Sequence, residues 1–152
     1  GSLYNACKFR AALNEALALA REANGYLDRK APWFQIKADR QAAATTVYVI
    51  LRVVDNLKTI LAPILPHTAQ QLHEYLGYEG QLFGTQHVVE YQEEARHGGL
   101  RAHEALTYDH TGAIGTWTVS ELPAGQALRQ PAPLFKKLDE SVIEEEYARL
   151  EG

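Results

Sequence analysis

The segment YLDRKAPWF, residues 26–34, holds the side chains whose chemistry is easiest to recognise. It places Trp33 directly behind Pro32, a residue that ends helices. The basic residues around this tryptophan in the sequence are Arg29, Lys30, Lys37 and Arg40. Such a tryptophan can fill a core, anchor a protein contact, or offer a platform for an unstacked base, with the cations holding phosphates. The residues alone favour core packing first and base stacking second.

No group of residues in the sequence indicates catalysis. The chain has no glycine-rich phosphate loop after a strand, no HExxH or CxxC motif, and no Gly-x-Ser-x-Gly elbow. Its six histidines match no metal-ligand spacing, since no two of them are four residues apart on an expected helix. We therefore predict no catalytic residue and no metal ligand.

Composition indicates an ordinary globular domain. The chain has 152 residues, of which 46% are hydrophobic and 22% charged. No apolar run approaches the ~18 residues of a membrane span, and no signal peptide is recognisable. The single cysteine, Cys7, fits a reducing compartment. We expect a cytoplasmic protein with no membrane contact, and residues 1–2 look like a cloning remnant on a piece of a longer chain.

Charge is distributed unevenly along the chain. Residues 1–40 hold seven Lys and Arg against four Asp and Glu, whereas residues 77–152 hold six against thirteen. The net positive charge is therefore in the first 40 residues, which include Trp33, although the whole chain carries a formal charge of -4. Such an imbalance is usual for a solvated surface and is also compatible with local phosphate binding.

Periodicity predicts a mainly α fold, with an antiparallel helix bundle over residues 3–78. Apolar side chains recur every three or four residues in three segments, which are Tyr4 to Leu27, Asp39 to about Leu61, and His67 to Leu76. Asp39 is the expected N-cap of the second helix, and Gly77 the expected C-terminal cap of the third. Pro32 should push Ala31 into an extended conformation, and Pro63 and Pro66 separate the last two helices.

The carboxy-terminal half is expected to be rich in loops. Residues 78–102 show no sustained period and predict a long surface connection within a 79–120 insertion. Two β-prone runs within residues 106–119 flank Asp109–Gly112 and predict a β-hairpin there. Residues 121–152 should form an extended segment and a helix starting near Ser141 that packs back on the bundle, with Ser141 and Glu144 as its capping pair.

Three motifs in this order resemble the carboxy-terminal helical domain of methionyl-tRNA synthetases, a class I aminoacyl-tRNA synthetase family. The first motif is an Asn, an aromatic residue two places on, Ala-Pro-Trp and a nearby lysine, here Asn24, Tyr26, Ala31, Pro32, Trp33 and Lys37. The second is the P-x-x-P junction at 63–66 with Leu76-Gly77 after the next helix. The third is Leu-Pro-x-Gly at 122–125 with Pro-x-Pro-Leu-Phe at 131–135. Together they span roughly 130 of the 152 residues.

The resemblance implies an anticodon-binding function. In that family the bundle reads the CAU anticodon of methionine tRNA, and the tryptophan of Ala-Pro-Trp stacks on an anticodon base. By position Trp33 takes this role, Pro32 presents it, and Asp28 borders the anticodon pocket. Asn24 and Tyr26 would support the site, and the expected partners are the tRNA anticodon stem-loop and the catalytic domain of the parent.

The sequence also departs from the family pattern. It contains neither the His-Ile-Gly-His-like nor the Lys-Met-Ser-Lys-Ser-like motif of the catalytic domain, and no Met. ATP, Mg and methionine are therefore expected in the parent's catalytic domain, with no cofactor in this chain, which cannot aminoacylate tRNA alone. The family's Asn and Arg that contact anticodon bases would lie on a first helix upstream of Tyr4, which this chain lacks.

Two alternatives remain open at this point. Isoleucyl, valyl, leucyl and cysteinyl synthetases carry related helical domains, from which the Ala-Pro-Trp motif with its upstream Asn and Tyr distinguishes this chain. A helical protein-interaction module, anchored by Trp33 and Phe34, belongs to a different class. The salt dependence of binding distinguishes an RNA-binding domain from a protein-interaction module. RNA binding through phosphates weakens steeply as the salt concentration rises, whereas an apolar protein contact hardly responds.

Overall fold

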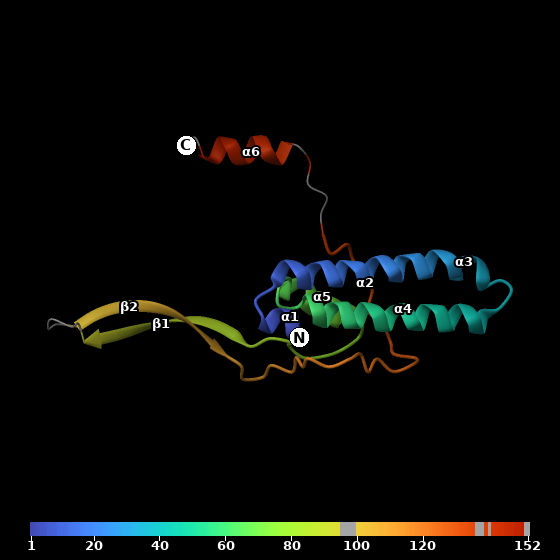
Figure 1. Ribbon diagram of the computed structural model, residues 1–152, viewed down its shortest axis with the longest axis horizontal. Coiled ribbons are helices and arrows are strands. Elements are labelled where there is room, and N and C mark those ends of the chain that lie inside the picture. The colour runs from blue at the N-terminus through green and yellow to red at the C-terminus, as the bar shows by residue number, and fades with distance from the viewer. Residues whose placement is uncertain (95–99, 136–138, 140, 151–152) are drawn as a thin grey trace.

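The computed structural model describes residues 1–94, 100–135, 139 and 141–150 (Figure 1). Its elements, in chain order, are α1 (Ser2–Asn5), α2 (Phe9–Lys30), α3 (Pro32–Gln35), α4 (Arg40–Leu61), α5 (Pro66–Tyr75), β1 (Thr85–Glu94), β2 (Leu100–Asp109) and α6 (Ser141–Leu150). The mainly α class is thereby confirmed. None of the helices in these ranges is long and apolar enough to cross a membrane.

Helices α2, α4 and α5 pack together and form the core. Helix α4 runs antiparallel to α2 and also contacts α5 (Figure 1). The side chains buried between them are mostly small: Ala12 and Ala16 on α2, Ala43 on α4 and Ala69 on α5. Small residues at the contact let helix axes approach closely. This packing fixes the first half of α4, which carries the candidate site.

Both predicted helix caps are confirmed. The Asp39 carboxylate accepts a hydrogen bond of 2.9 Å from the Ala42 amide, at the start of α4. Gly77 has a φ of +82° just after α5, a conformation that costs glycine little. Its amide donates to the Glu74 carbonyl over 3.0 Å. Both caps depend on neighbours in sequence, which is why the sequence predicted them.

The first helix differs from the prediction at both ends. Cys7 has a φ of +54° and divides the expected helix into α1 and α2, since the Cys7 and Lys8 amides turn back onto α1 carbonyls. Helix α2 then continues to Lys30. The predicted extended conformation of Ala31 is wrong: Ala31 is left-handed, with a φ of +41°, and its amide donates to the Leu27 carbonyl. A residue before proline avoids the right-handed helical region, and here the left-handed region ends α2 and starts α3.

The β-hairpin exists but lies earlier in the chain than predicted. Strand β1, Thr85–Glu94, pairs antiparallel with β2, Leu100–Asp109, within the segment expected to be an irregular connection. Residues 110–119 after β2 form no strand. Figure 1 shows the hairpin extending away from the helices. Since both of its faces are open, neither strand needs the alternation of apolar and polar residues on which the prediction relied.

One face of the hairpin carries a cross-strand pair of apolar residues and a cross-strand pair of acidic residues. Val88 lies opposite Leu106, and both side chains are largely exposed. Two residues further along, Glu90 lies directly opposite Glu104. Like charges in such positions destabilise a strand pair. The hairpin is therefore not stabilised by an apolar face of its own.

Helix α6 begins at Ser141 as predicted, but it lies away from the bundle (Figure 1). Its apolar residues Ile143, Tyr147 and Leu150 are exposed. The expected packing against the bundle is therefore absent among the described residues. Ser141 is the first helical residue, and its amide donates to the Asp139 carboxylate. The expected capping partner Glu144 has a side chain outside the described part.

Candidate functional site

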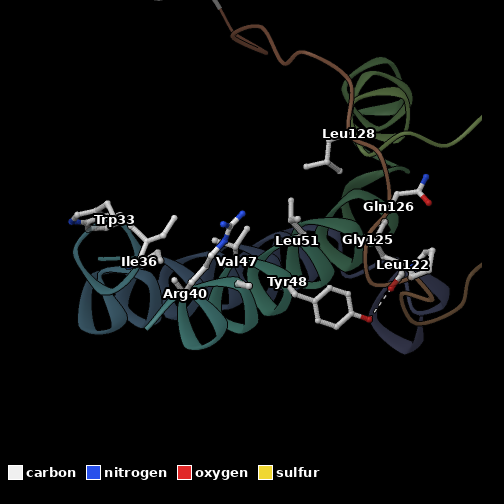
Figure 2. Close-up of a pocket in the computed structure, with 14 residues that line it drawn as sticks. Trp33, Ile36, Arg40, Val47, Tyr48, Leu51, Leu122, Gly125, Gln126 and Leu128 are labelled. Carbon is white, nitrogen blue, oxygen red and sulfur yellow. Dashed lines mark hydrogen bonds between the residues drawn. The ribbon is translucent and has the colours of Figure 1, made fainter. Parts of the chain in front are cut away.

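A groove of about 560 Å³ runs along the first half of α4 (Figure 2). We call it the α3–α4 groove. It is lined by Pro32, Trp33, Ile36, Arg40, Ala43, Ala44, Val47, Tyr48, Leu51, Leu122, Pro123, Gly125, Gln126 and Leu128. The lining is mainly apolar, with few polar groups, as in most pockets that bind organic ligands.

Trp33 lies at one end of this groove (Figure 2). Pro32 is buried and forms the first turn of α3, so the neighbouring ring is held at the surface. Trp33 itself is 50% exposed, and the Phe34 ring meets it edge-on with 6.3 Å between centroids. The reading of Trp33 as a core residue is therefore wrong. Its ring is available to a base or to a partner protein.

The four cations near Trp33 differ in their relation to the groove. Arg40, at the start of α4, lines it, whereas Arg29, Lys30 and Lys37 do not. All four side chains are exposed. None has an acidic partner within ion-pair distance in the described part of the chain. Arg29 and Lys30 also occupy the last turn of α2, where positive charge suits the helix dipole.

The remaining predicted site residues lie on α2, outside the lining of the groove. Asp28 is exposed near the carboxy-terminal end of the helix. Asn24 is exposed about one turn earlier, and Tyr26 is half-buried. Neither Asn24 nor Tyr26 has a side-chain hydrogen bond to another described residue, so no contact in this structure connects them to Trp33.

Sequence reasoning assigned no site residue to the segment that forms the second wall of the groove. We call residues 120–129 the strap. Leu122 of the strap is buried, and its carbonyl accepts a 2.9 Å hydrogen bond from the Tyr48 hydroxyl. At the far end, Gln126 Nε2 donates to the Gly77 carbonyl over 2.9 Å, and the Arg129 amide donates to Tyr75 over 3.0 Å. The Leu-Pro-x-Gly motif was the one available signal.

A buried ionic cluster joins α4 and α5 to the segment after Gly77. Lys58 Nζ lies 2.6 Å from Asp55 Oδ1, and the Tyr78 hydroxyl donates to Asp55 Oδ2 over 3.0 Å. His73 stacks on the Tyr78 ring with centroids 4.9 Å apart. A second cavity, of about 670 Å³, touches this cluster. In the described residues, no group of three or more His, Cys, Asp or Glu side chains could hold a metal ion.

Burial and hydrogen bonds shift the pKa values in this cluster. Burial alone would raise the pKa of Asp55, but hydrogen bonds from Lys58, Ser120 and Tyr78 and the Lys58 charge lower it below its usual value. Burial, with the Asp55 hydrogen bond, raises the pKa of Tyr78 to about 12. Burial also lowers the pKa of His73, whose Nδ1 has no hydrogen-bond partner among the described residues. The cluster therefore holds a charged Asp55–Lys58 pair and a neutral His73.

The chain resembles one family along its whole length. The family model described as "Anticodon binding domain of methionyl tRNA ligase" matches residues 2–98. The "Methionine--tRNA ligase" of Thermomicrobium roseum is 55% identical over 152 residues, covering 99% of this chain and 25% of that protein. The protein of the same name from Chloroflexus aggregans is 51% identical, covering 100% of this chain and 25% of that protein.

The matched residues 2–98 include Trp33 and the α3 and α4 side of the groove, whereas the strap lies beyond them. The chain belongs to the family of methionyl-tRNA ligase anticodon-binding domains. It spans about a quarter of the length of the relatives it matches. The resemblance found in the motifs is thereby confirmed.

Proposed function

We propose that this chain recognises the CAU anticodon of methionine tRNA by stacking a base on Trp33. The observation that supports this most directly is the half-exposed Trp33 ring, which the buried Pro32 holds at the mouth of an apolar groove. Single-stranded loops can splay their bases onto aromatic rings. An anticodon loop is such a substrate.

The surrounding residues suit the same ligand. The exposed cations Arg29, Lys30, Lys37 and Arg40 are proposed to contact phosphates. Asp28 would border the anticodon pocket from the last turns of α2. Asn24 and Tyr26 would support the site from the same helix, without base contact. The four cations and Asp28 would orient the loop so that one base reaches Trp33.

In the whole protein, this domain would serve a methionine-tRNA ligase that charges tRNA with methionine using ATP. The helices would then form the class I synthetase type of anticodon-binding bundle, next to a catalytic domain, in the cytoplasm. ATP, Mg and methionine would bind that other domain, since no residue here matches its motifs. Binding energy from the anticodon would help place the distant acceptor end, so specificity would appear in the rate as well as in binding.

Replacing Trp33 with alanine should weaken binding of a CAU anticodon stem-loop by about 5- to 150-fold, because stacking contributes ~1–3 kcal/mol per base. The fold should persist, since half of the side chain is already exposed. Titration of labelled stem-loops bearing CAU or GAU measures the effect, and melting temperatures check the fold.

Trp117→Ala is the matched control, because Trp117 is 51% exposed and lies outside the α3–α4 groove. Equal losses of RNA affinity in the two variants would contradict the stacking role of Trp33. A large drop in melting temperature for Trp33→Ala, with unchanged RNA affinity, would make Trp33 a structural residue.

Replacing Arg40 with glutamine should reduce the slope of log affinity against log salt by about 0.7, the value for one phosphate contact on a single strand. Arg40 lines the groove and has no ion-pair partner in the described residues, so its charge is free to meet a phosphate. The same titration at several salt concentrations gives the slope. Arg101→Gln, on exposed β2, should leave it unchanged, and identical slopes for both variants would rule out the Arg40 contact.

A further inference from the structure

The α3–α4 groove is longer than one base requires. At 1.5 Å per residue, the stretch of α4 from Arg40 to Leu51 that lines it is about 16 Å long. Stacked bases are separated by about 3.4 Å. In Figure 2, Trp33 lies at one end of the groove and Leu128 of the strap near the other. A base on Trp33 therefore leaves the strap end of the groove open.

Exposed apolar side chains are distributed along the whole groove. Ile36 follows Trp33, Val47 lies between Arg40 and Leu51 on α4, and Leu128 reaches from the strap toward Leu51 (Figure 2). Leu128 is 48% exposed although it contributes to a groove wall. Single exposed apolar residues are common, but several that share one groove indicate a binding surface.

Hydrogen bonds within the chain hold the strap in place. The Tyr48 hydroxyl fixes the Leu122 carbonyl on α4, and Gln126 and Arg129 fix the other end to Gly77 and to the last residue of α5. These bonds join residues far apart in the sequence. Because the strap is already ordered, binding a ligand there costs little conformational entropy. The strap end of the groove is therefore a preformed contact surface.

The positive charges near the groove favour a nucleotide as its ligand. Arg40 lines the groove, and the exposed Arg29, Lys30 and Lys37 precede it in the sequence, all without acidic partners in the described residues. An apolar protein segment would match the walls and gain nothing from these cations. Nucleotides match both, because bases have apolar faces and phosphates carry negative charge.

We propose that Leu128 contacts a second nucleotide of the same RNA loop, so that the groove holds one base against Trp33 and another against the strap. This inference rests on the proposed anticodon recognition and extends it to residues more than ninety positions further along the chain. Leu128 acts as a binding residue for RNA, and Tyr48 acts as a positioning residue through the Leu122 carbonyl.

The test combines protein variants with RNA lacking single bases. Leu128→Ala should weaken binding of the CAU stem-loop about fivefold or more, as expected for the loss of an apolar contact. Leu128→Phe, which keeps an apolar surface, should retain binding. Leu106→Ala on β2 is the matched control, since it removes an exposed leucine far from the groove. Melting temperatures confirm that all variants are folded.

Abasic nucleotides, placed at one loop position at a time, then locate each contact. The loss caused by Leu128→Ala should vanish at one abasic position, and the loss caused by Trp33→Ala at a different one. If Trp33 matters while Leu128→Ala behaves like Leu106→Ala, the strap contact is wrong and the proposed function stands. If both losses vanish at the same position, the groove holds one base and the inference fails. If neither variant weakens binding, both proposals fail.

Discussion

Replacing Asp55 with alanine should lower the free energy of unfolding by about 3–5 kcal/mol, because it leaves the Lys58 ammonium buried without its partner. The side chains of Lys58 and Asp55 are only 9% and 5% exposed, and their charged atoms are 2.6 Å apart. The Tyr78 hydroxyl would also lose its acceptor. Urea denaturation at neutral pH measures the loss.

The chain contains a matched control for this prediction. Glu146 and Arg149 form a pair with the same spacing and a 2.7 Å distance, but their side chains are 58% and 72% exposed. Glu146→Ala should therefore change stability by no more than about 0.5 kcal/mol. A double variant, Asp55→Ala with Lys58→Met, should recover much of the loss, since no charge then remains buried. Equal losses for Asp55→Ala and Glu146→Ala would contradict the role of burial.

The pKa of Asp55 explains why the urea denaturation should be done at neutral pH. Its folded-state pKa lies below the usual 3.8, so the carboxylate is charged in both states at neutral pH. The contribution of the pair is complete above the unfolded value and declines as the pH falls through the folded value. Denaturation at neutral pH therefore measures the full effect.

Replacing Gly77 with alanine should destabilise the fold by about 2–4 kcal/mol and also weaken RNA binding. A Cβ at this position would lie 2.0 Å from the Ala127 carbonyl oxygen of the strap, and the φ of +82° is unfavourable for alanine. The methyl group must therefore move the strap away from α5. Thermal denaturation and the CAU stem-loop titration measure the two effects.

Gly112→Ala separates backbone strain from the steric clash. Gly112 has a φ of +79°, but a Cβ there would meet no atom within 4 Å. This variant should lose about 1–2 kcal/mol from conformation alone and keep its RNA affinity. If Gly77→Ala and Gly112→Ala showed the same loss and equal RNA binding, the strap would not depend on Gly77.

Local sequence signals were sufficient to predict α4 and α5 and their caps, but they did not predict the break at Cys7 or the short helix α3. The Asp39 carboxylate accepts from an amide three residues later, the Gly77 amide donates to a carbonyl three residues earlier, and the apolar period of α4 repeats within a single element. The hairpin position was missed because its open faces carry no alternation. The left-handed Ala31 was missed because proline excludes one backbone region without selecting between the others.

The candidate site was only half predictable, for a physical reason. Pro32 and Trp33 were identified by the Ala-Pro-Trp motif, and Arg40 by its closeness to Trp33 in the sequence. The opposite wall reaches α4 through contacts such as Tyr48 with Leu122, which no local pattern encodes. The exposure of Trp33 was likewise undetermined, because an aromatic ring beside a proline suits a core as well as a surface.

The acidic pair on the hairpin has a consequence for solubility. Each strand pairs only with the other within the described residues, so each leaves one edge of backbone groups unpaired. Such edges, beside the exposed Val88 and Leu106, invite strand addition by a second copy and then aggregation. Any added strand would lie about 4.8 Å away. Glu90 and Glu104 already repel each other there, so a copy carrying the same charges would be repelled more strongly, and the hairpin resists the growth of a larger sheet.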